Sequence, residues 1–175
     1  MDIFVDTGIV IGYADSEDLN FHQPCFRFVN NHRFRDNGYY SNLEVITTEV
    51  SRKESQRCYV KTKTAFRRFV QRAKIFIDHL VDASYEQHNQ FGLMFQNIHS
   101  TLIRYGTPNH PMDRDAKLLT SSFLWELEAQ NLISPCFLTT DYHDIYKNRA
   151  KLTETANLYL PRNSRLNIEF INSID

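Results

Sequence analysis

An uninterrupted apolar run near the amino terminus ends abruptly in a carboxylate. Ile3, Phe4 and Val5 show no polar alternation, and Asp6 follows them directly. A continuous apolar run of this kind is typical of a strand buried on both faces of a parallel sheet. Ligands of open α/β sheets bind at the carboxyl ends of the strands, so Asp6 is a candidate for chemistry. It is equally a candidate cap for the helix that follows.

Apolar strands alternate with helical periodicity along the whole chain. Strands are expected at 2–6, 38–42, 136–141 and 166–171, and helices at about 8–14, 22–31, 113–130 and 142–150. This alternation predicts an α/β fold with a central parallel sheet of about four to five strands. The long helical stretch in between, at about 58–105, is expected to form a helical subdomain against one edge of the sheet.

A second strand repeats the pattern of the first. Phe137 and Leu138 lead through two threonines to Asp141, and Asp144 follows one helical turn later. If the sheet reverses direction between the two strands, as doubly wound sheets do, Asp6 and Asp141 become neighbours at one crevice. Two carboxylates that close repel each other and need a cation or a shared proton. The alternative is that Asp141 and Asp144 only cap a turn.

A third acid begins the apolar stripe of the helix in "DRDAKLLTSSFLWELE". Leu119, Phe123 and Leu127 recur every four residues, and Asp115 lies one turn before Leu119 on the same face. An unpaired carboxylate on a core-facing stripe is costly, whereas a helix amino terminus or a bound metal ion favours it. Asp113, just before, is the alternative ligand or a cap.

The fourth acid is expected on the helix that follows the second strand. Ser41 and Glu44 have the spacing of a capping box, and Glu49 lies further along the same helix. Glu54 is a third alternative. The pattern does not choose among these glutamates.

Composition restricts the class of protein. The chain has 175 residues, of which 42% are hydrophobic and 23% charged, and no repeat or linker divides it, so residues 1–175 are expected to form one domain. A net charge of −1 excludes a uniformly basic nucleic-acid binder. The three scattered cysteines predict neither a disulfide framework nor a zinc site, and no apolar run is long enough to span a bilayer. We therefore expect a cytoplasmic protein with no membrane partner.

A local basic segment lies in the middle of the chain. Between Arg52 and Lys74, nine Lys or Arg accompany a single acid, Glu54. Apolar residues at helical spacing form one face of this segment, and cations line another. The cations expected to bind a nucleic-acid backbone are Lys61, Lys63, Arg67, Arg68, Arg72 and Lys74. A solvated helix face or an acidic partner protein are the alternatives.

Four motifs in order resemble the PIN-domain ribonucleases, which are related to the flap endonucleases. They are "IFVDTGIVIGYAD", an acid on the first long helix after the second strand, "DAKLLTSSFLWE" and "FLTTDYHD". The resemblance implies a three-layer α/β/α fold and a Mg²⁺ or Mn²⁺ ion that activates a water for phosphodiester hydrolysis. The metal-site positions that it carries over are Asp6, Glu44 or Glu49, Asp115, Asp141 and Asp144. Gly8 departs from the family, in which many members have Asn or Ser there.

The residue types suit this chemistry independently of the family. Mg²⁺ prefers oxygen ligands and lowers the pKa of a bound water. A phosphatase with Asp6 as nucleophile is disfavoured, because no second acid follows two residues later. We therefore predict a metal-dependent endoribonuclease that acts on RNA, with Asp6, Glu49, Asp115 and Asp141 as catalytic residues. A catalytically silent PIN scaffold is the alternative, and a homodimer and an inhibitory, antitoxin-like protein are left open as partners.

Overall fold

The computed structural model describes residues 1–33, 38–58, 62–108 and 112–174. Its centre is a five-stranded sheet with the order β3-β2-β1-β4-β5, and all the neighbouring strands are parallel. The strands are β1 (Asp2–Val5), β2 (Gly38–Ser41), β3 (Val81–Asp82), β4 (Cys136–Thr139) and β5 (Asn167–Phe170). The chain adds β2 and β3 on one side of β1 and then crosses to add β4 and β5 on the other, so the strand order reverses between β1 and β4.

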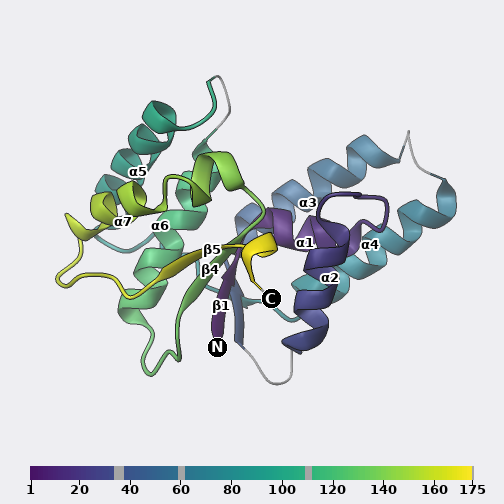
Figure 1. Cartoon of the computed structure of the whole chain (residues 1–175), viewed down its shortest axis with the longest axis horizontal. Helices are drawn as coiled ribbons and strands as arrows, with labels where there is room; N and C mark the ends of the chain where they lie inside the picture. The colour runs from purple at the N-terminus through teal and green to yellow at the C-terminus, as the bar shows by residue number, and fades with distance from the viewer. Residues whose placement is uncertain (34–37, 59–61, 109–111, 175) are drawn as a thin grey trace.

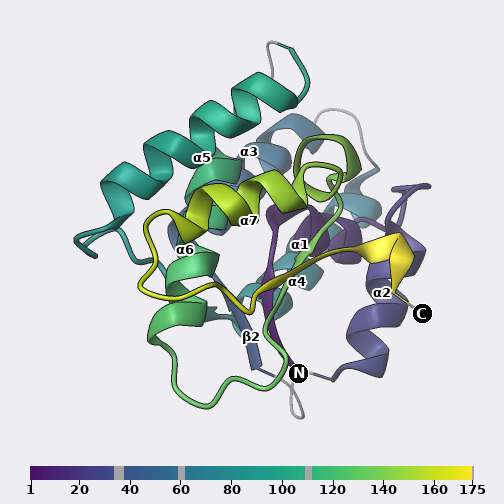
Figure 2. The ribbon, with the colours of Figure 1, turned by 60° about the vertical axis from the view of Figure 1, so that its left-hand side comes forward.

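Helices cover both faces of the sheet and complete a three-layer arrangement (Figures 1 and 2). One face carries α1 (Thr7–Ala14), α2 (His22–Asn31), α3 (Leu43–Arg57) and α4 (Lys63–Ile77). The other carries α5 (Phe91–Tyr105), α6 (Asp113–Glu128) and α7 (Arg149–Asn157). A π-helical turn, η1 (Tyr142–Tyr146), follows β4, and a 3₁₀ turn, η2 (Ile171–Ser173), follows β5. No helix of the described residues is long and apolar enough to cross a membrane.

The central strand β1 has no solvent-facing side. Phe4 lies in register with Tyr40 of β2 and Phe137 of β4. Its ring centroid lies 5.9 Å from that of Phe137 and 5.7 Å from that of Trp125 on α6. Because helices pack on both faces, every side chain between Ile3 and Val5 is buried, which accounts for the unbroken apolar run in the sequence.

The helical subdomain expected at about 58–105 does not form a single unit. α4 packs against α1 and α3, whereas α5 packs against α6 and α7 on the opposite face of the sheet. Between them, β3 extends the sheet beyond β2. β3 was not predicted, because it has two residues that are both exposed and therefore shows no strand pattern. The helix expected at 142–150 is likewise two elements, η1 and the start of α7.

A buried carboxylate anchors the loop that leads into β5. The side chain of Glu126 on α6 is fully buried and accepts hydrogen bonds from Arg162 Nη1 at 3.2 Å, Arg165 Nε at 3.1 Å and Ser164 Oγ at 3.0 Å. Burial raises the pKa of Glu126, but these hydrogen bonds outweigh burial and leave the pKa below its usual value. The three hydrogen bonds tie the loop before β5 to the helical layer.

Candidate active site

Asp6 and Asp141 follow two strands that are neighbours in the sheet. β1 and β4 pair with Val5 opposite Leu138, and the backbone N–H of Asp6 extends this ladder by donating to the carbonyl of Leu138 at 3.0 Å. Both acids therefore lie at the point where the strand order reverses. Burial raises the pKa of Asp6, and the charge of Asp141 raises it further. The structure thus brings these two acids together.

Thr139 connects the two acids, and the sequence pattern did not identify it. Its hydroxyl donates to Oδ2 of Asp6 at 2.6 Å and accepts from the backbone N–H of Asp141 at 2.9 Å. Thr139 is fully buried, so these two bonds occupy its hydroxyl out of reach of water. The available signal was a hydroxyl residue just before an acid at a strand end, a pattern that many turns share.

Both acids are also helix caps. The side chain of Asp6 accepts from the N–H of Gly8 at 3.4 Å at the start of α1, and the side chain of Asp141 accepts from the N–H of Asp144 at 2.8 Å at the start of η1. The capping interpretation and the site interpretation therefore describe the same residues. A helix start places backbone N–H groups beside each carboxylate and lowers the cost of its charge.

Gly8 gives Thr140 the space to pack against α1. A Cβ on Gly8 would overlap Oγ1 of Thr140 and lie 3.1 Å from its Cβ. The Asn or Ser that many PIN domains carry at this position would meet the same side chain. The departure noted in the sequence therefore has a packing cause, the close approach of α1 to the end of β4.

Asp115 completes the acidic group from the other layer. It lies in the first turn of α6, and its pKa is raised to about 8, first by burial and then by the charges of Asp6 and Asp141. Arg114 lowers this pKa, and Asp144 adds to the rise. Asp113, the alternative ligand, has a side chain that is 75% exposed and pairs with His99 on α5 at 3.0 Å. Asp115 is thus the residue of this pair that shares an electrostatic environment with the strand-end acids.

Asp144 holds the α5–α6 connection. It is buried, and its Oδ1 accepts from the backbone N–H of Thr107 at 2.5 Å and from the Thr107 hydroxyl at 2.7 Å. This connection leads into the start of α6, where Asp115 lies. Asp144 therefore fixes Thr107 just after α5, and its negative charge helps to raise the pKa of Asp115.

The two glutamates of α3 have different surroundings. The side chain of Glu44 is 68% exposed, and it lies 3.8 Å from the ammonium group of Lys117. That of Glu49 is 7% exposed and forms ion pairs with Arg52 and with Arg114, the residue before Asp115. Both glutamates therefore lie near the start of α6, with Glu49 buried against Arg114 and Glu44 exposed beside Lys117.

The capping box predicted at the start of α3 was wrong. Asn42 is the cap, and its side chain accepts from the N–H of Val45 at 3.1 Å. Ser41 is the last residue of β2, and its hydroxyl donates to the carbonyl of Val5 at 2.8 Å. The strand extends one residue further than a capping box allows, so the serine bonds to the sheet and Glu44 has no partner in a box.

The carboxylate oxygens of these acids are the kind of ligand that a hard divalent cation binds. The negative charge of Asp141 raises the pKa of Asp6, and the charges of Asp6 and Asp141 raise the pKa of Asp115. A cation between these carboxylates would relieve their repulsion. Within the described residues, no three His, Cys, Asp or Glu side chains are placed to hold a single ion. Mg²⁺ often binds through one or two carboxylates and keeps several waters, so it does not require such a trio.

Comparisons with known proteins bear on the fold. No protein-family model matches the chain, and no curated protein matches its sequence. Among solved structures, the crystal structure of VapBC2 from Rickettsia felis bound to a DNA fragment from their promoter is similar, with a TM-score of 0.54 and 14% sequence identity over 97% of this chain and 98% of that chain. The fold is PIN-like. At this identity the likeness shows the fold alone.

The cations expected to bind nucleic acid lie on or near α4 of the PIN-like fold. Lys63, Arg67, Arg68 and Lys74 are exposed on this helix, and Lys74 borders α3 in a pocket that Thr47, Ser51 and Glu54 also line. Arg72 is half-buried, and its guanidinium carbon lies 5.9 Å from the centroid of the Phe26 ring on α2. Lys61 lies outside the described residues. Arg72 thus has a packing role that the four exposed cations do not share.

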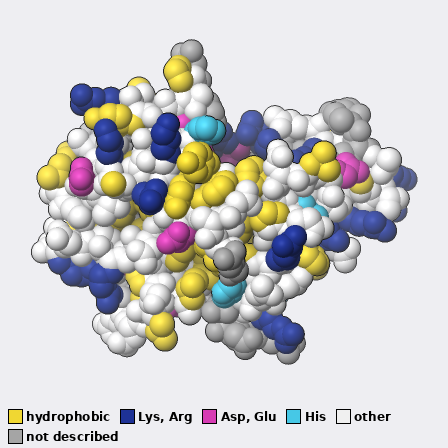
Figure 3. Space-filling model, in the orientation of Figure 1, with side chains coloured by type: hydrophobic (Ala, Val, Ile, Leu, Met, Phe, Trp, Pro, Cys, Tyr) yellow, Lys and Arg dark blue, Asp and Glu magenta, His cyan; other side chains and the backbone are white. Residues whose placement is uncertain are grey.

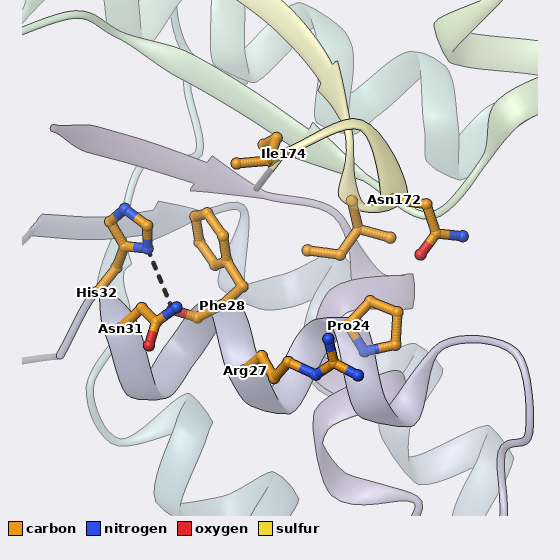
Figure 4. A pocket seen from close by; sticks show the side chains of 8 residues that line it. Pro24, Arg27, Phe28, Asn31, His32, Asn172 and Ile174 are labelled. Atoms are coloured by element: carbon orange, nitrogen blue, oxygen red, sulfur yellow. Dashed lines mark hydrogen bonds between the residues drawn. The ribbon is translucent and has the colours of Figure 1, made fainter.

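A separate pocket of about 400 Å³ lies between α2 and the carboxyl-terminal segment (Figure 4). Arg27, Asn31 and His32 line it from α2 and its end, and Asn172 and Ile174 line it from the other side. None of the acids described above lines this pocket. It is therefore distinct from the candidate active site.

The electrostatics of Asp115 predict how stability depends on pH. Its pKa is about 8 in the fold against 3.8 for the free side chain, so the folded protein binds a proton over a range in which the unfolded chain has lost it. We expect the contribution of Asp115 protonation to the free energy of unfolding to be fully present below pH 3.8 and to be lost as pH rises towards 8. Urea unfolding of the metal-free protein in EDTA across this range measures the effect.

The matched control is Asp115→Asn, which has no carboxyl group to titrate. The difference in unfolding free energy between the parent and this variant isolates the contribution of Asp115 from that of the other groups. Parallel pH profiles for the two proteins would contradict the prediction.

Proposed function

We propose that this protein is a divalent-metal-dependent endoribonuclease acting on cytoplasmic RNA. The observation that carries the proposal is the mutual charge interaction of Asp6, Asp115 and Asp141 where the strand order reverses. Buried carboxylates whose charges raise their neighbours' pKa gain most from a bound cation. When bound, Mg²⁺ or Mn²⁺ lowers the pKa of a water that attacks the phosphodiester.

The side chains have distinct roles in this proposal. One or two of the carboxylates of Asp6, Asp115 and Asp141 would bind the metal ion directly, and the remaining carboxylate would contribute its negative charge through bound water. Thr139 fixes the orientation of Asp6 by donating to it at 2.6 Å. Asp144 holds Thr107, just after α5, through its hydrogen bond with the Thr107 hydroxyl. Glu49 is the glutamate assigned to the site, through its ion pair with Arg114.

A catalytically silent scaffold is the second candidate function. The observation that favours it is the pairing of buried Glu49 with two arginines, which leaves this acid engaged without a metal ion. The similar structure contains VapBC2 bound to promoter DNA. This likeness supports an inhibitory, antitoxin-like protein as a proposed partner. A second copy of the chain is a separate proposal.

A cleavage assay separates the two functions. The purified chain is incubated with end-labelled RNAs, one structured and one unstructured, in EDTA, Mg²⁺, Mn²⁺ or Ca²⁺. We expect internal fragments with Mg²⁺ or Mn²⁺ and intact RNA in EDTA, because the acids alone lack a group that activates water. Intact RNA under every condition would favour the silent scaffold.

The exposed cations of α4 are proposed to bind the RNA backbone. Arg67→Ala with Arg68→Ala is expected to weaken binding of single-stranded RNA and to reduce the slope of log K against log salt by about 0.7 for each phosphate that is no longer neutralised. Both side chains are exposed, so the fold is preserved. Binding is measured from low to moderate salt in EDTA.

The matched control removes two exposed arginines from another part of the molecule. Arg27→Ala with Arg33→Ala, at α2 and just beyond it, leaves the α4 cations intact. An unchanged salt slope in the Arg67/Arg68 variant would contradict the proposal and indicate that these cations are only solvated.

A further inference from the structure

Three aromatic side chains gather where β4 and β5 end. The ring centroid of Tyr142 lies 5.3 Å from that of Phe170 and 5.8 Å from that of Tyr146, and the rings of Tyr146 and Phe170 are also 5.8 Å apart. We call this group the aromatic platform. It adjoins the candidate active site directly, because Tyr142 is the residue after Asp141.

The local backbone presents this platform beside the acid. In the π-helical turn η1, the N–H of Tyr146 donates to the carbonyl of Asp141 at 3.0 Å, and that of Lys147 donates to the carbonyl of Tyr142 at 2.9 Å. π-turns are rare and occur often at functional sites. Phe170 packs against both tyrosine rings from the end of β5. Tyr142 remains 46% exposed, so part of its ring is accessible to a ligand.

Cations border the platform. The guanidinium carbon of Arg149 lies 4.2 Å from the centroid of the Tyr146 ring, and its Nη1 donates to the carbonyl of Tyr146 at 3.0 Å. Arg149 also lines a groove of about 420 Å³ between α7 and β5, whose wall includes Glu169 and Arg165, the latter paired with Glu126. Figure 3 shows hydrophobic side chains gathered on this face of the molecule with Lys and Arg beside them.

We propose that the aromatic platform is a nucleobase-binding subsite, in which Tyr142 stacks an unpaired base next to the scissile phosphate and Arg149 binds a neighbouring phosphate. The inference rests on the proposed nuclease function. Exposed aromatic rings with bordering cations are the features that bind single-stranded nucleic acid, because every base has a face that stacks. A base held in a duplex cannot reach the ring, so the strand at this subsite is unpaired.

Variants of Tyr142 in the cleavage-deficient Asp6→Asn background test the subsite. The probe is a short unstructured oligoribonucleotide that carries 2-aminopurine at one position at a time, because stacking on an aromatic ring quenches its fluorescence. The parent in this test is the Asp6→Asn protein with Tyr142 intact. We expect it to quench the fluorescence of the probe at one or two adjacent positions. Tyr142→Leu, which keeps an apolar side chain but removes the ring, should abolish this quenching and weaken binding about 5- to 100-fold.

Tyr142→Phe is the matched control, since it keeps the ring and loses only the hydroxyl. It should quench and bind like the parent, and thermal unfolding confirms that each variant is folded. Equal binding and quenching by the parent and Tyr142→Leu would overturn the proposal and leave the platform to a protein partner. Equal losses in the Phe and Leu variants would also overturn it, because the hydroxyl would then carry the effect.

Failure of the base-binding subsite and failure of the proposed nuclease function give different results. Position-specific quenching that depends on the Tyr142 ring, in a protein that cleaves no RNA, would support the subsite and reject the nuclease. Metal-dependent cleavage by Tyr142→Leu with parental KM and kcat, together with unchanged quenching, would reject the subsite and retain the nuclease.

Discussion

Asp6→Asn is expected to reduce metal-dependent RNA cleavage by about 10³-fold while the fold is retained. The amide has nearly the volume of the carboxylate, so packing at the end of β1 is preserved. Its Oδ1 can still accept from the N–H of Gly8, and its Nδ2 can donate to the hydroxyl of Thr139. It lacks the charge, so a divalent cation is lost or displaced. Single-turnover cleavage with saturating Mn²⁺ measures the loss.

The same substitution should stabilise the metal-free protein. The pKa of Asp6 is raised by burial and by the charge of Asp141, so removing the charge relieves an unfavourable interaction. We expect a higher Tm for Asp6→Asn than for the parent in EDTA at pH above 7. A variant with lower activity and a lower Tm would show that Asp6 acts as a structural cap.

Asp113→Asn is the control for this experiment. Asp113 begins α6 only two residues before Asp115, but its side chain is 75% exposed and pairs with His99. Cleavage by this variant should equal that of the parent. Parental cleavage by Asp6→Asn, or an equal loss in both variants, would contradict the assignment of Asp6 as a metal-binding residue.

Glu126→Ala is expected to lower the free energy of unfolding by about 3 kcal/mol. The fully buried carboxylate accepts hydrogen bonds from two arginines and a serine, and their loss frees the loop before β5. The side chains of Arg162 and Arg165 are 39% and 60% exposed, so water can solvate them when Glu126 is removed. The loss of unfolding free energy is therefore smaller than it would be for a charge left buried without a partner. Urea denaturation at neutral pH measures the change.

Glu128→Ala provides the comparison for Glu126. Glu128 lies at the end of the same helix, and its side chain is 49% exposed beside His88. Its removal should change the unfolding free energy by less than about 0.5 kcal/mol. Similar destabilisation by the two substitutions would show that loss of charge on α6, and not the buried anchor, controls stability.

Local sequence patterns determined the sheet and the acids at its strand ends. β1 and β4 are apolar at their centres because helices cover both faces, and this burial is visible in consecutive residues. Asp6 and Asp141 each follow such a run, so their positions at the carboxyl edge followed from the pattern alone. The periodicity of α6 likewise placed Asp115 on the inner face, because Leu119 and Phe123 are buried one and two turns later.

Tertiary structure decided the features that depend on interactions between distant segments. Glu49 and Glu44 look alike in the sequence, and only the packing of α3 beside α6 brings Glu49 to Arg114 and leaves Glu44 largely in solvent. β3 exists because β2 offers it backbone partners, since its two exposed residues carry no apolar signal.

The connections within the site depend on tertiary structure in the same way. Thr139 joins Asp6 to Asp141 although Asp6 lies 133 positions away along the chain, and the raised pKa of Asp115 arises from burial and from charges on another layer of the fold. Burial, ion pairing and mutual repulsion are properties of the assembled layers. A pattern along one chain determines which side chains face inward, and the packing of those layers determines which of them meet.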